Sequence, residues 1–284
     1  MPIPFPWELP NHVRGIDIAN PQPDLPWEKI AAAGVVTTSI KATDFTGDGR
    51  PFVDSMLDKH QHGAVERGSQ IVDYYAFIHS NLPARIQIEH FAATIEKRPR
   101  MARWWADFED AHRISPDPQR AFDCICEFMR LGKSLLGEDG GIYTYPSIMP
   151  LLAKIGDLSE LARYDLWLAH YRIDPATGKD YGLTAPSIPD PWRSLGGGQG
   201  WRPGISGCCV GWQVTGNIGP RLPDCPAIDN DVFFGPRSLF DQWRHRDDRH
   251  EPAPTQPDSP ASPIGWQDRA EAEAEDGDDE ENKS

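Results

Sequence analysis

The sequence contains no hydrophobic run of the length that crosses a membrane. A transmembrane helix needs roughly 18 or more consecutive apolar residues, and no stretch of this chain approaches that length. Its first residues, MPIPFPWELPNHV, have neither the basic segment nor the apolar segment of a secretory signal. We therefore expect no membrane insertion and no signal peptide.

Cysteine is scarce, and its spacing favours free thiols. The five cysteines are an odd number, and Cys208 and Cys209 are adjacent, which does not suit a disulfide framework. Cys124 and Cys126 are separated by one residue on an expected helix, so their side chains point in different directions. The turn DFTGDG, residues 44–49, lacks the acidic twelfth residue of a calcium loop. The sequence thus predicts neither a metal site nor a cofactor.

Positive charge is scarce relative to negative charge. The chain has 28 Lys and Arg against 43 Asp and Glu, a formal net charge of -15, which argues against a nucleic acid as partner. About half of the excess lies in residues 268–284. Residues 245–284 are rich in proline and acidic residues and poor in apolar ones, so we predict that they are disordered. This tail either keeps the chain soluble or docks a basic protein partner.

Short β-rich runs recur along the rest of the chain. Eight such runs are RGIDIA, VVTTSIKAT, QIVDYYAFI, WWADFED, GIYTY, YDLWLAHY, CVGWQVTG and DVFF. Helical patterns lie between the earlier runs, the clearest over residues 117–137 with Asp117 as N-cap and Gly137 as terminator. Another helix is expected after Pro26, ending at Gly34.

This alternation predicts an α/β fold. We expect either a parallel barrel or a doubly wound sheet, and favour an irregular, TIM-like (β/α) barrel with about eight strands and fewer helices. Residues 172–207 are rich in Gly and Pro without a helical period, so the barrel is expected to be irregular there. The predicted organisation is an N-terminal extension (1–13), the barrel (14–244) and the disordered acidic tail (245–284).

The run WWADFED places carboxyl groups beside aromatic rings. If the run is a strand, Asp107 and Glu109 point the same way, with Cα atoms about 6.5 to 7 Å apart, and Phe108 faces the opposite layer. Mutual repulsion would raise the proton affinity of at least one carboxyl group. A protonated acid beside an ionised one suits acid-catalysed cleavage of a glycosidic bond. A solvated turn is the alternative interpretation, with Trp104 and Trp105 simply packed in the core.

Carboxyl groups also stand at the ends of two distant runs. Asp17 ends the first predicted strand, and Asp229 lies beside the last. In barrels, the carboxyl ends of the strands meet at one mouth, so we expect these two to join Asp107 and Glu109. Asp231 and Asp110 are the near-register rivals of Asp229 and Glu109, and the apolar pattern around them favours the first choices.

Eight segments in order resemble one known family over residues 14–235. They are GIDIANPQPDLPW (15–27), IKATDF (40–45), YYAFIHS (74–80), ADFED (106–110), GIYTY (141–145), LWLAHY (166–171), GWQVTG (211–216) and AIDNDVF (227–233). The sequence is similar to the family-25 glycoside hydrolases, lysozymes that cleave peptidoglycan as N-acetylmuramidases. The resemblance implies an irregular β/α barrel and hydrolysis of the β-1,4 bond between N-acetylmuramic acid and N-acetylglucosamine.

The resemblance also implies roles for single residues. Glu109 would be the general acid, and Asp107 the anionic partner that stabilises positive charge or orients the substrate acetamido group. Asp17 and Asp229 would shape the site and tune the pair. The expected sugar-groove residues are Tyr75, Tyr143, Trp167, Tyr171, Trp212 and Gln213.

The sequence departs from the family pattern near two strand ends. Ala76 replaces the His of YHF, and Asp44 followed by Phe45 replaces the Glu-Gly of KATEG. His79 falls on the opposite strand face from Ala76, so it is not interpreted as a replacement. These departures motivate an alternative, a non-catalytic peptidoglycan-binding or structural phage protein on the same fold. Another alternative is a glycosidase of a different acetamido polysaccharide such as chitin.

The expected partner is bacterial peptidoglycan. A wall-degrading domain without an export signal suits a phage lysin or a virion-associated lysozyme, made in the host cytoplasm and delivered to the wall by phage lysis or in the particle. A bacterial effector exported by another route remains open. Peptidoglycan is itself anionic, so the acidic tail is not expected to assist wall binding.

Overall fold

Eight strands close into a barrel. They are β1 (His12–Ile18), β2 (Val35–Phe45), β4 (Ile71–Phe77), β5 (Trp104–Asp107), β6 (Gly141–Thr144), β7 (Asp165–Ala169), β8 (Cys209–Thr215) and β9 (Asp229–Phe234). Each strand pairs with the next in this order, and β9 pairs with β1 to close the ring. A further short strand, β3 (Pro51–Val53), forms a hairpin with the end of β2. The predicted barrel is thus confirmed, and the doubly wound sheet is excluded because β1 also pairs with β2.

The computed structural model of the chain describes residues 12–22, 24–68, 71–98, 103–114, 116–155, 157–171, 207–215, 228–235 and 237–244. All of them belong to the first of two units, Met1–Arg249. Most of the Gly- and Pro-rich connection 172–207 and the whole acidic tail lie outside the described residues. The domain boundaries and the disorder of the tail therefore stay predictions.

The last strand runs against its neighbours. Neighbouring strands from β1 round to β8 are parallel, whereas β9 is antiparallel to both β8 and β1. The expectation of an all-parallel barrel was wrong at this strand. A parallel β9 would need a crossover along the whole barrel, but the chain instead re-enters the sheet at the rim where β8 ends. We call this rim, where the parallel strands end, the C-terminal rim.

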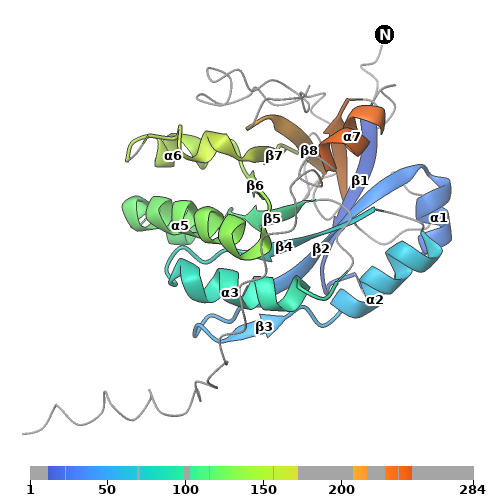
Figure 1. Cartoon of the computed structure of the whole chain (residues 1–284), viewed down its shortest axis with the longest axis horizontal. Coiled ribbons are helices and arrows are strands. Elements are labelled where there is room, and N and C mark those ends of the chain that lie inside the picture. The colour runs from blue at the N-terminus through green and yellow to red at the C-terminus, as the bar shows by residue number, and fades with distance from the viewer. Residues whose placement is uncertain are drawn as a thin grey trace, which may run out of the picture. The chain divides into compact units, whose positions relative to one another are not determined.

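The helices lie on the outside of the barrel (Figure 1). They are α1 (Trp27–Ala32), α2 (Leu57–His62) with its π-helical continuation η2 (Gly63–Arg67), α3 (Ala84–Ile95), α4 (Ala111–Ile114), α5 (Pro118–Leu136), α6 (Met149–Leu152), the 3-10 turn η3 (Leu161–Arg163) and α7 (Arg237–Arg244). The longest, α5, begins and ends as predicted: Asp117 accepts a hydrogen bond from the Arg120 N–H at 3.1 Å, and Gly137 has a left-handed φ of 75°.

The two adjacent tryptophans pack in two different hydrophobic cores, one inside the barrel and one between the strands and the helices. Trp105 faces the barrel interior, where it packs against Trp167 and Phe233. Trp104 faces the outer layer between strands and helices, against Phe91 and Phe128. Each is fully buried, and removing about 200 Å² of an indole from water stabilises the fold by about 5 kcal/mol. The WW pair is therefore core, and its strand positions Asp107 at the C-terminal rim.

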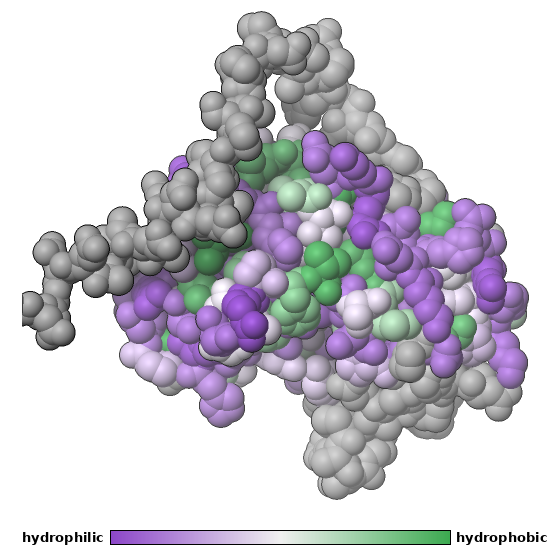
Figure 2. Space-filling model, turned by 90° about the horizontal axis from the view of Figure 1, so that it is seen from below, coloured by the Kyte–Doolittle hydropathy of each residue, from purple (hydrophilic) through white to green (hydrophobic). Residues whose placement is uncertain are grey.

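The face seen from below the view of Figure 1 is largely hydrophilic, with hydrophobic groups gathered near its centre (Figure 2). Among the described residues, the large hydrophobic side chains that remain exposed are Phe52, Val53, Ile86 and Leu135. Within the described ranges, no helix has the length and apolar character needed to cross a membrane.

Candidate active site

Carboxyl groups from three distant segments meet at the C-terminal rim. Asp107 is the last residue of β5, and Glu109 follows it in the loop. Asp17 of β1 stands directly opposite Asp229, the first residue of β9. The charges of all four act on the hydroxyl group of Tyr75. The convergence expected from the strand ends is thus present, although the antiparallel β9 delivers Asp229 from its beginning and not from its end.

A pocket opens among these groups. It is lined by Asp17, Tyr75, Asp107, Tyr143 and Trp167, all contributed by strands of the barrel. Trp167 meets the Tyr143 ring edge to face, with the ring centroids 4.7 Å apart. The pocket therefore has an aromatic floor and acidic walls, which is the combination that a sugar ring with polar edges and an apolar face would fit.

Glu109 stands in a loop beside Asp107, outside the five residues that line the pocket. The strand was expected to continue through residue 110, but β5 ends at Asp107. The Phe108 N–H still donates to the Tyr143 carbonyl oxygen at 2.9 Å, and the Phe108 side chain packs in the outer core as expected. The Ala111 N–H then donates to the Glu109 carbonyl oxygen at 2.7 Å, just where α4 begins. Glu109 is therefore partly exposed, whereas Asp107 is buried.

Burial raises the pKa of both members of the acid pair. For Asp107, burial acts first and the Glu109 charge adds to it, while the Lys41 ammonium opposes the rise. For Glu109, burial raises the pKa, and the Tyr145 hydroxyl group and the Lys41 charge oppose this. Two neighbouring carboxyl groups in such a setting do not both ionise easily. The pair therefore retains a proton at a pH where a free carboxylic acid has lost it.

A hydrogen-bond chain crosses the pocket beside this pair. The Tyr143 hydroxyl donates to Gln213 Oε1 at 2.6 Å, and Gln213 Nε2 donates to Asp17 Oδ2 at 2.7 Å. Burial raises the pKa of Asp17, the Asp229 charge adds to this, and the Gln213 hydrogen bond opposes it. Gln213 thus fixes Asp17 in place and joins β6 to β1 through β8.

The predicted sugar-groove residues divide into two groups. Tyr75, Tyr143 and Trp167 line the pocket, whereas the Tyr171 hydroxyl lies 2.9 Å from the Tyr145 hydroxyl, outside that lining. Trp212, in contrast, packs in the outer core and donates its N–H to the His170 carbonyl oxygen at 2.6 Å. The assignment of Trp212 to the groove was wrong, because Gln213 takes the inward position and its neighbour must face outward.

The two rival carboxyl groups occupy other places. Asp110 pairs with Arg113 Nε at 3.0 Å and accepts the Arg113 N–H at 3.2 Å, so it holds the start of α4. Asp231 is fully buried and faces Gly15 and Gln213 across the sheet, one layer below Asp229. Burial raises its pKa, and the charge of the neighbouring Asp17 adds to the rise. The charges that act most strongly on the Tyr75 hydroxyl include those of Glu109 and Asp229 and neither rival.

Three groups around the pocket were not predicted. Lys41 stands in the quoted segment IKATDF, and Tyr145 closes the quoted run GIYTY, two residues after Tyr143 and one beyond the end of β6. Asp73 lies below the pocket, where it accepts the Trp105 N–H at 2.9 Å, and burial raises its pKa to about 7. A carboxyl group inside the apolar run QIVDYYAFI was the available sign of this buried acid.

The departures from the family pattern fall outside the pocket lining. Ala76 packs in the outer core. His79 was assigned to a strand face, but β4 ends at Phe77, so His79 lies in the following loop. There its Nε2 contacts Asp44 Oδ1 at 2.6 Å. The arrangement as a whole can donate a proton from one carboxyl group and oppose a developing positive charge with its ionised neighbours.

Several solved structures share this fold. A family 25 glycosyl hydrolase from Bacillus anthracis is 20% identical, with a TM-score of 0.61 over 82% of this chain and 94% of that one. A muramidase from Acremonium alcalophilum is 19% identical, with a TM-score of 0.60 over 82% and 99%. A bacterial lysozyme from Streptomyces coelicolor is 18% identical, with a TM-score of 0.58 over 83% and 98%. No curated protein matches the chain.

The sequence itself matches a family over more than half of its length. Residues 16–189 match the family described as Glycosyl hydrolases family 25. This span contains Asp17, the acid pair and the aromatic lining of the pocket, while the closing strands β8 and β9 lie beyond it. The chain therefore belongs to the glycosyl hydrolases of family 25.

Proposed function

We propose that this glycosidase hydrolyses peptidoglycan as an N-acetylmuramidase, at the β-1,4 bond between N-acetylmuramic acid and N-acetylglucosamine. The observation that carries the proposal is the meeting of Asp17, Asp107, Glu109 and Asp229 around the Tyr75 hydroxyl in an aromatic-floored pocket. Family membership supports it, as do the similar structures, whose names include lysozymes and muramidases.

The proposed proton donor is Glu109. A general acid must touch the leaving oxygen, and Glu109 is the more exposed member of the acid pair. Asp107, deeper in the pocket, opposes the positive charge that develops on the sugar ring or orients the acetamido group. Asp17 and Asp229 add negative potential, which favours the oxocarbenium-like transition state.

Replacing Glu109 by Gln tests this assignment. The amide keeps the shape of the side chain but cannot supply the proton, so we expect release of reducing ends from purified cell wall to fall by about 100-fold or more. Mass spectrometry of the wild-type products identifies the sugar at the new reducing end. Undiminished lysis by Glu109→Gln, or N-acetylglucosamine at the new reducing end, would reject the proposal.

The proposed setting is a phage lysin or virion-associated lysozyme. The catalytic domain of an endolysin from a Listeria monocytogenes phage shares the fold, with a TM-score of 0.52 and 17% identity. Bacterial lysis on co-expression with a pore-forming protein, but not without it, would support this setting. Lysis by the protein alone would point to another route of delivery.

A further inference from the structure

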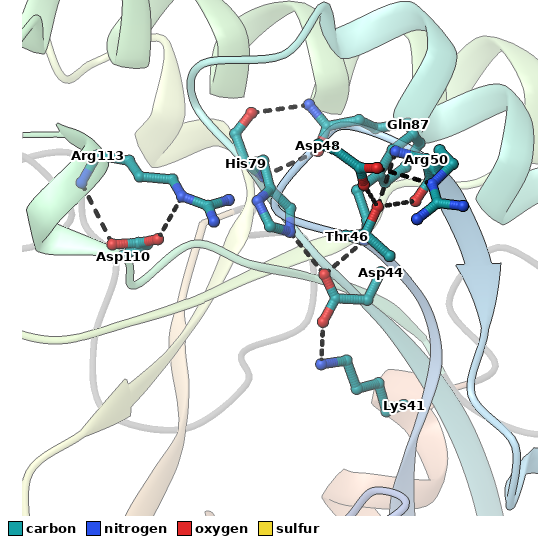
Figure 3. A network of polar contacts seen from close by, with 10 residues as sticks. Lys41, Asp44, Thr46, Asp48, Arg50, His79, Gln87, Asp110 and Arg113 are labelled. Carbon is teal, nitrogen blue, oxygen red and sulfur yellow. Dashed lines mark hydrogen bonds and ion pairs between the residues drawn. The ribbon is translucent and has the colours of Figure 1, made fainter.

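Lys41, Asp44 and His79 form a row of contacting side chains (Figure 3). The row begins with Lys41 of β2, whose ammonium group contacts Asp44 Oδ2. The other oxygen of Asp44 contacts His79 Nε2 at 2.6 Å. All three side chains are largely withdrawn from water, with exposed fractions of 17% for Lys41, 14% for Asp44 and 5% for His79.

Asp44 accepts contacts through both of its carboxyl oxygens. Its Oδ1 accepts the Phe45 N–H at 2.6 Å as well as the contact from His79, and its Oδ2 takes the Lys41 ammonium. A carboxylate with three donors is fixed in direction. Since Asp44 accepts through both oxygens, His79 donates from Nε2, and this places its proton on that nitrogen.

His79 is fixed in turn by the backbone and by aromatic rings. Its N–H donates to Gln87 Oε1 at 2.8 Å, and its carbonyl oxygen accepts from Gln87 Nε2 at 2.9 Å, which ties the loop to α3. The imidazole meets the Phe77 and Phe45 rings edge to face, with centroids 5.2 and 6.3 Å apart. His79 therefore has little freedom to leave Asp44.

The other end of the row lies beside the acid pair. The Lys41 ammonium sits over the Phe77 ring, 4.9 Å from its centroid. Phe77 is the sheet neighbour of Asp107, and Lys41 is the sheet neighbour of Tyr75, which lines the pocket. The cation is therefore placed at the edge of the pocket nearest to Asp107.

We propose that His79 is a positioning residue, which holds Asp44 so that the Lys41 ammonium stays beside Asp107 and Glu109 and sets the pH range in which the acid pair keeps its proton. This role rests on the proposed function of that pair. A free lysine side chain would spread its charge over many rotamers. Because His79 holds Asp44, and Asp44 contacts the Lys41 ammonium, the positive charge of Lys41 stays in one position relative to the acid pair.

The electrostatic surroundings agree with this role. The Lys41 charge lowers the pKa of Asp107 and of Glu109, against the rise caused by burial. The other charged or titratable groups that face the pair are Asp17 of β1, Asp44 of β2, Tyr75 of β4, Asp110 before α4, Tyr143 and Tyr145 of the β6 end, Tyr171 after β7 and Asp229 of β9. These are acids and phenols, so a displaced Lys41 leaves no second cation in this set to replace it.

Three variants of the full chain test the proposal. His79→Leu removes the donor, His79→Gln keeps a nitrogen donor at the position of Nε2, and Lys41→Met removes the cation. We expect the alkaline limb of kcat/KM on a soluble peptidoglycan oligosaccharide to move to higher pH, by about one pH unit in Lys41→Met and about half a unit in His79→Leu. His79→Gln should keep the wild-type profile.

A titration without substrate separates this inference from the proposed function. Carbon-13 NMR measures the pKa of the Glu109 carboxyl group directly. This pKa should be lowest in the wild type and in His79→Gln, higher in His79→Leu, and highest in Lys41→Met. A merely structural role of His79 would lower activity equally at every pH and leave both profiles unmoved. An unmoved limb in Lys41→Met would overturn the proposal even if His79→Leu did not fold. An inactive wild type with the expected NMR order would overturn the muramidase assignment alone.

Discussion

Replacing Asp73 by Asn should make the chain more stable, and increasingly so as the pH rises. Asp73 is buried below the active site and accepts the Trp105 N–H at 2.9 Å, with Ser39 as its neighbour on the adjacent strand β2. Burial raises its pKa from 3.8 to about 7. An Asn side chain has the same shape, can accept from Trp105 and donate to Ser39, and carries no charge to desolvate.

The sign and size follow from proton linkage. An acid with a higher pKa in the folded chain binds more protons when folded, so stability is fully present below pH 3.8 and falls as the pH rises toward about 7. The difference between these pKa values corresponds to about 4 kcal/mol at pH 8, of which about 3 kcal/mol is lost between pH 5 and pH 8. Asp73→Asn abolishes this loss.

Urea unfolding followed by tryptophan fluorescence at pH 5 and pH 8 measures the effect. The free energy of unfolding of Asp73→Asn, minus that of the wild type, should rise by about 3 kcal/mol between the two pH values. Asp123→Asn on the exposed face of α5 is the control for loss of one negative charge. A difference that is the same at both pH values would show that folded Asp73 is ionised throughout, and would refute the reasoning.

Three other changes test the packing and the site. Gly141→Ala would bring a methyl group 2.1 Å from a ring carbon of Trp105, and thermal unfolding should show a loss of about 3 kcal/mol. Asp117→Ala removes the N-cap of α5 and should cost about 1 kcal/mol by the same assay, with Asp117→Asn as the tolerated control. Gln213→Leu removes the hydrogen bonds to Tyr143 and Asp17. We expect kcat to fall about 10- to 100-fold while the protein remains folded. An unchanged kcat would exclude a role for this chain of hydrogen bonds.

The eight strands could be predicted from sequence because each is a short, apolar, β-rich run between turn residues. The meeting of Asp17 with Asp107 also followed, because both stand at or next to the ends of parallel strands at one rim. The direction of β9 could not be predicted, since a strand pattern of period two is the same in both directions. The position of Glu109 in a loop depends on where the ladder of β5 stops, which the neighbouring strand decides.

Facing direction was the main source of error for single residues. Because side chains alternate along a strand, Trp212 and Gln213 must point to opposite sides of β8. The alternation does not say which of them points into the barrel. The packing of Trp212 against the outer layer decides this. For His79 the period does not apply, because β4 has already ended. The row from Lys41 to His79 joins the end of one strand to the loop after another, and only their pairing in the sheet reveals it.

The last strand to be synthesised, β9, completes both the barrel and the cluster of carboxyl groups. Gln213 and Asp17, which share a hydrogen bond, are 196 positions apart in the sequence. Asp229 can face Asp17 only after β9 has paired with both β8 and β1. A ribosome-bound chain that has not yet released β9 keeps two unpaired strand edges and an incomplete set of carboxylates. With Asp229 part of the proposed site, we expect a chain that still lacks β9 to release no reducing ends from cell wall.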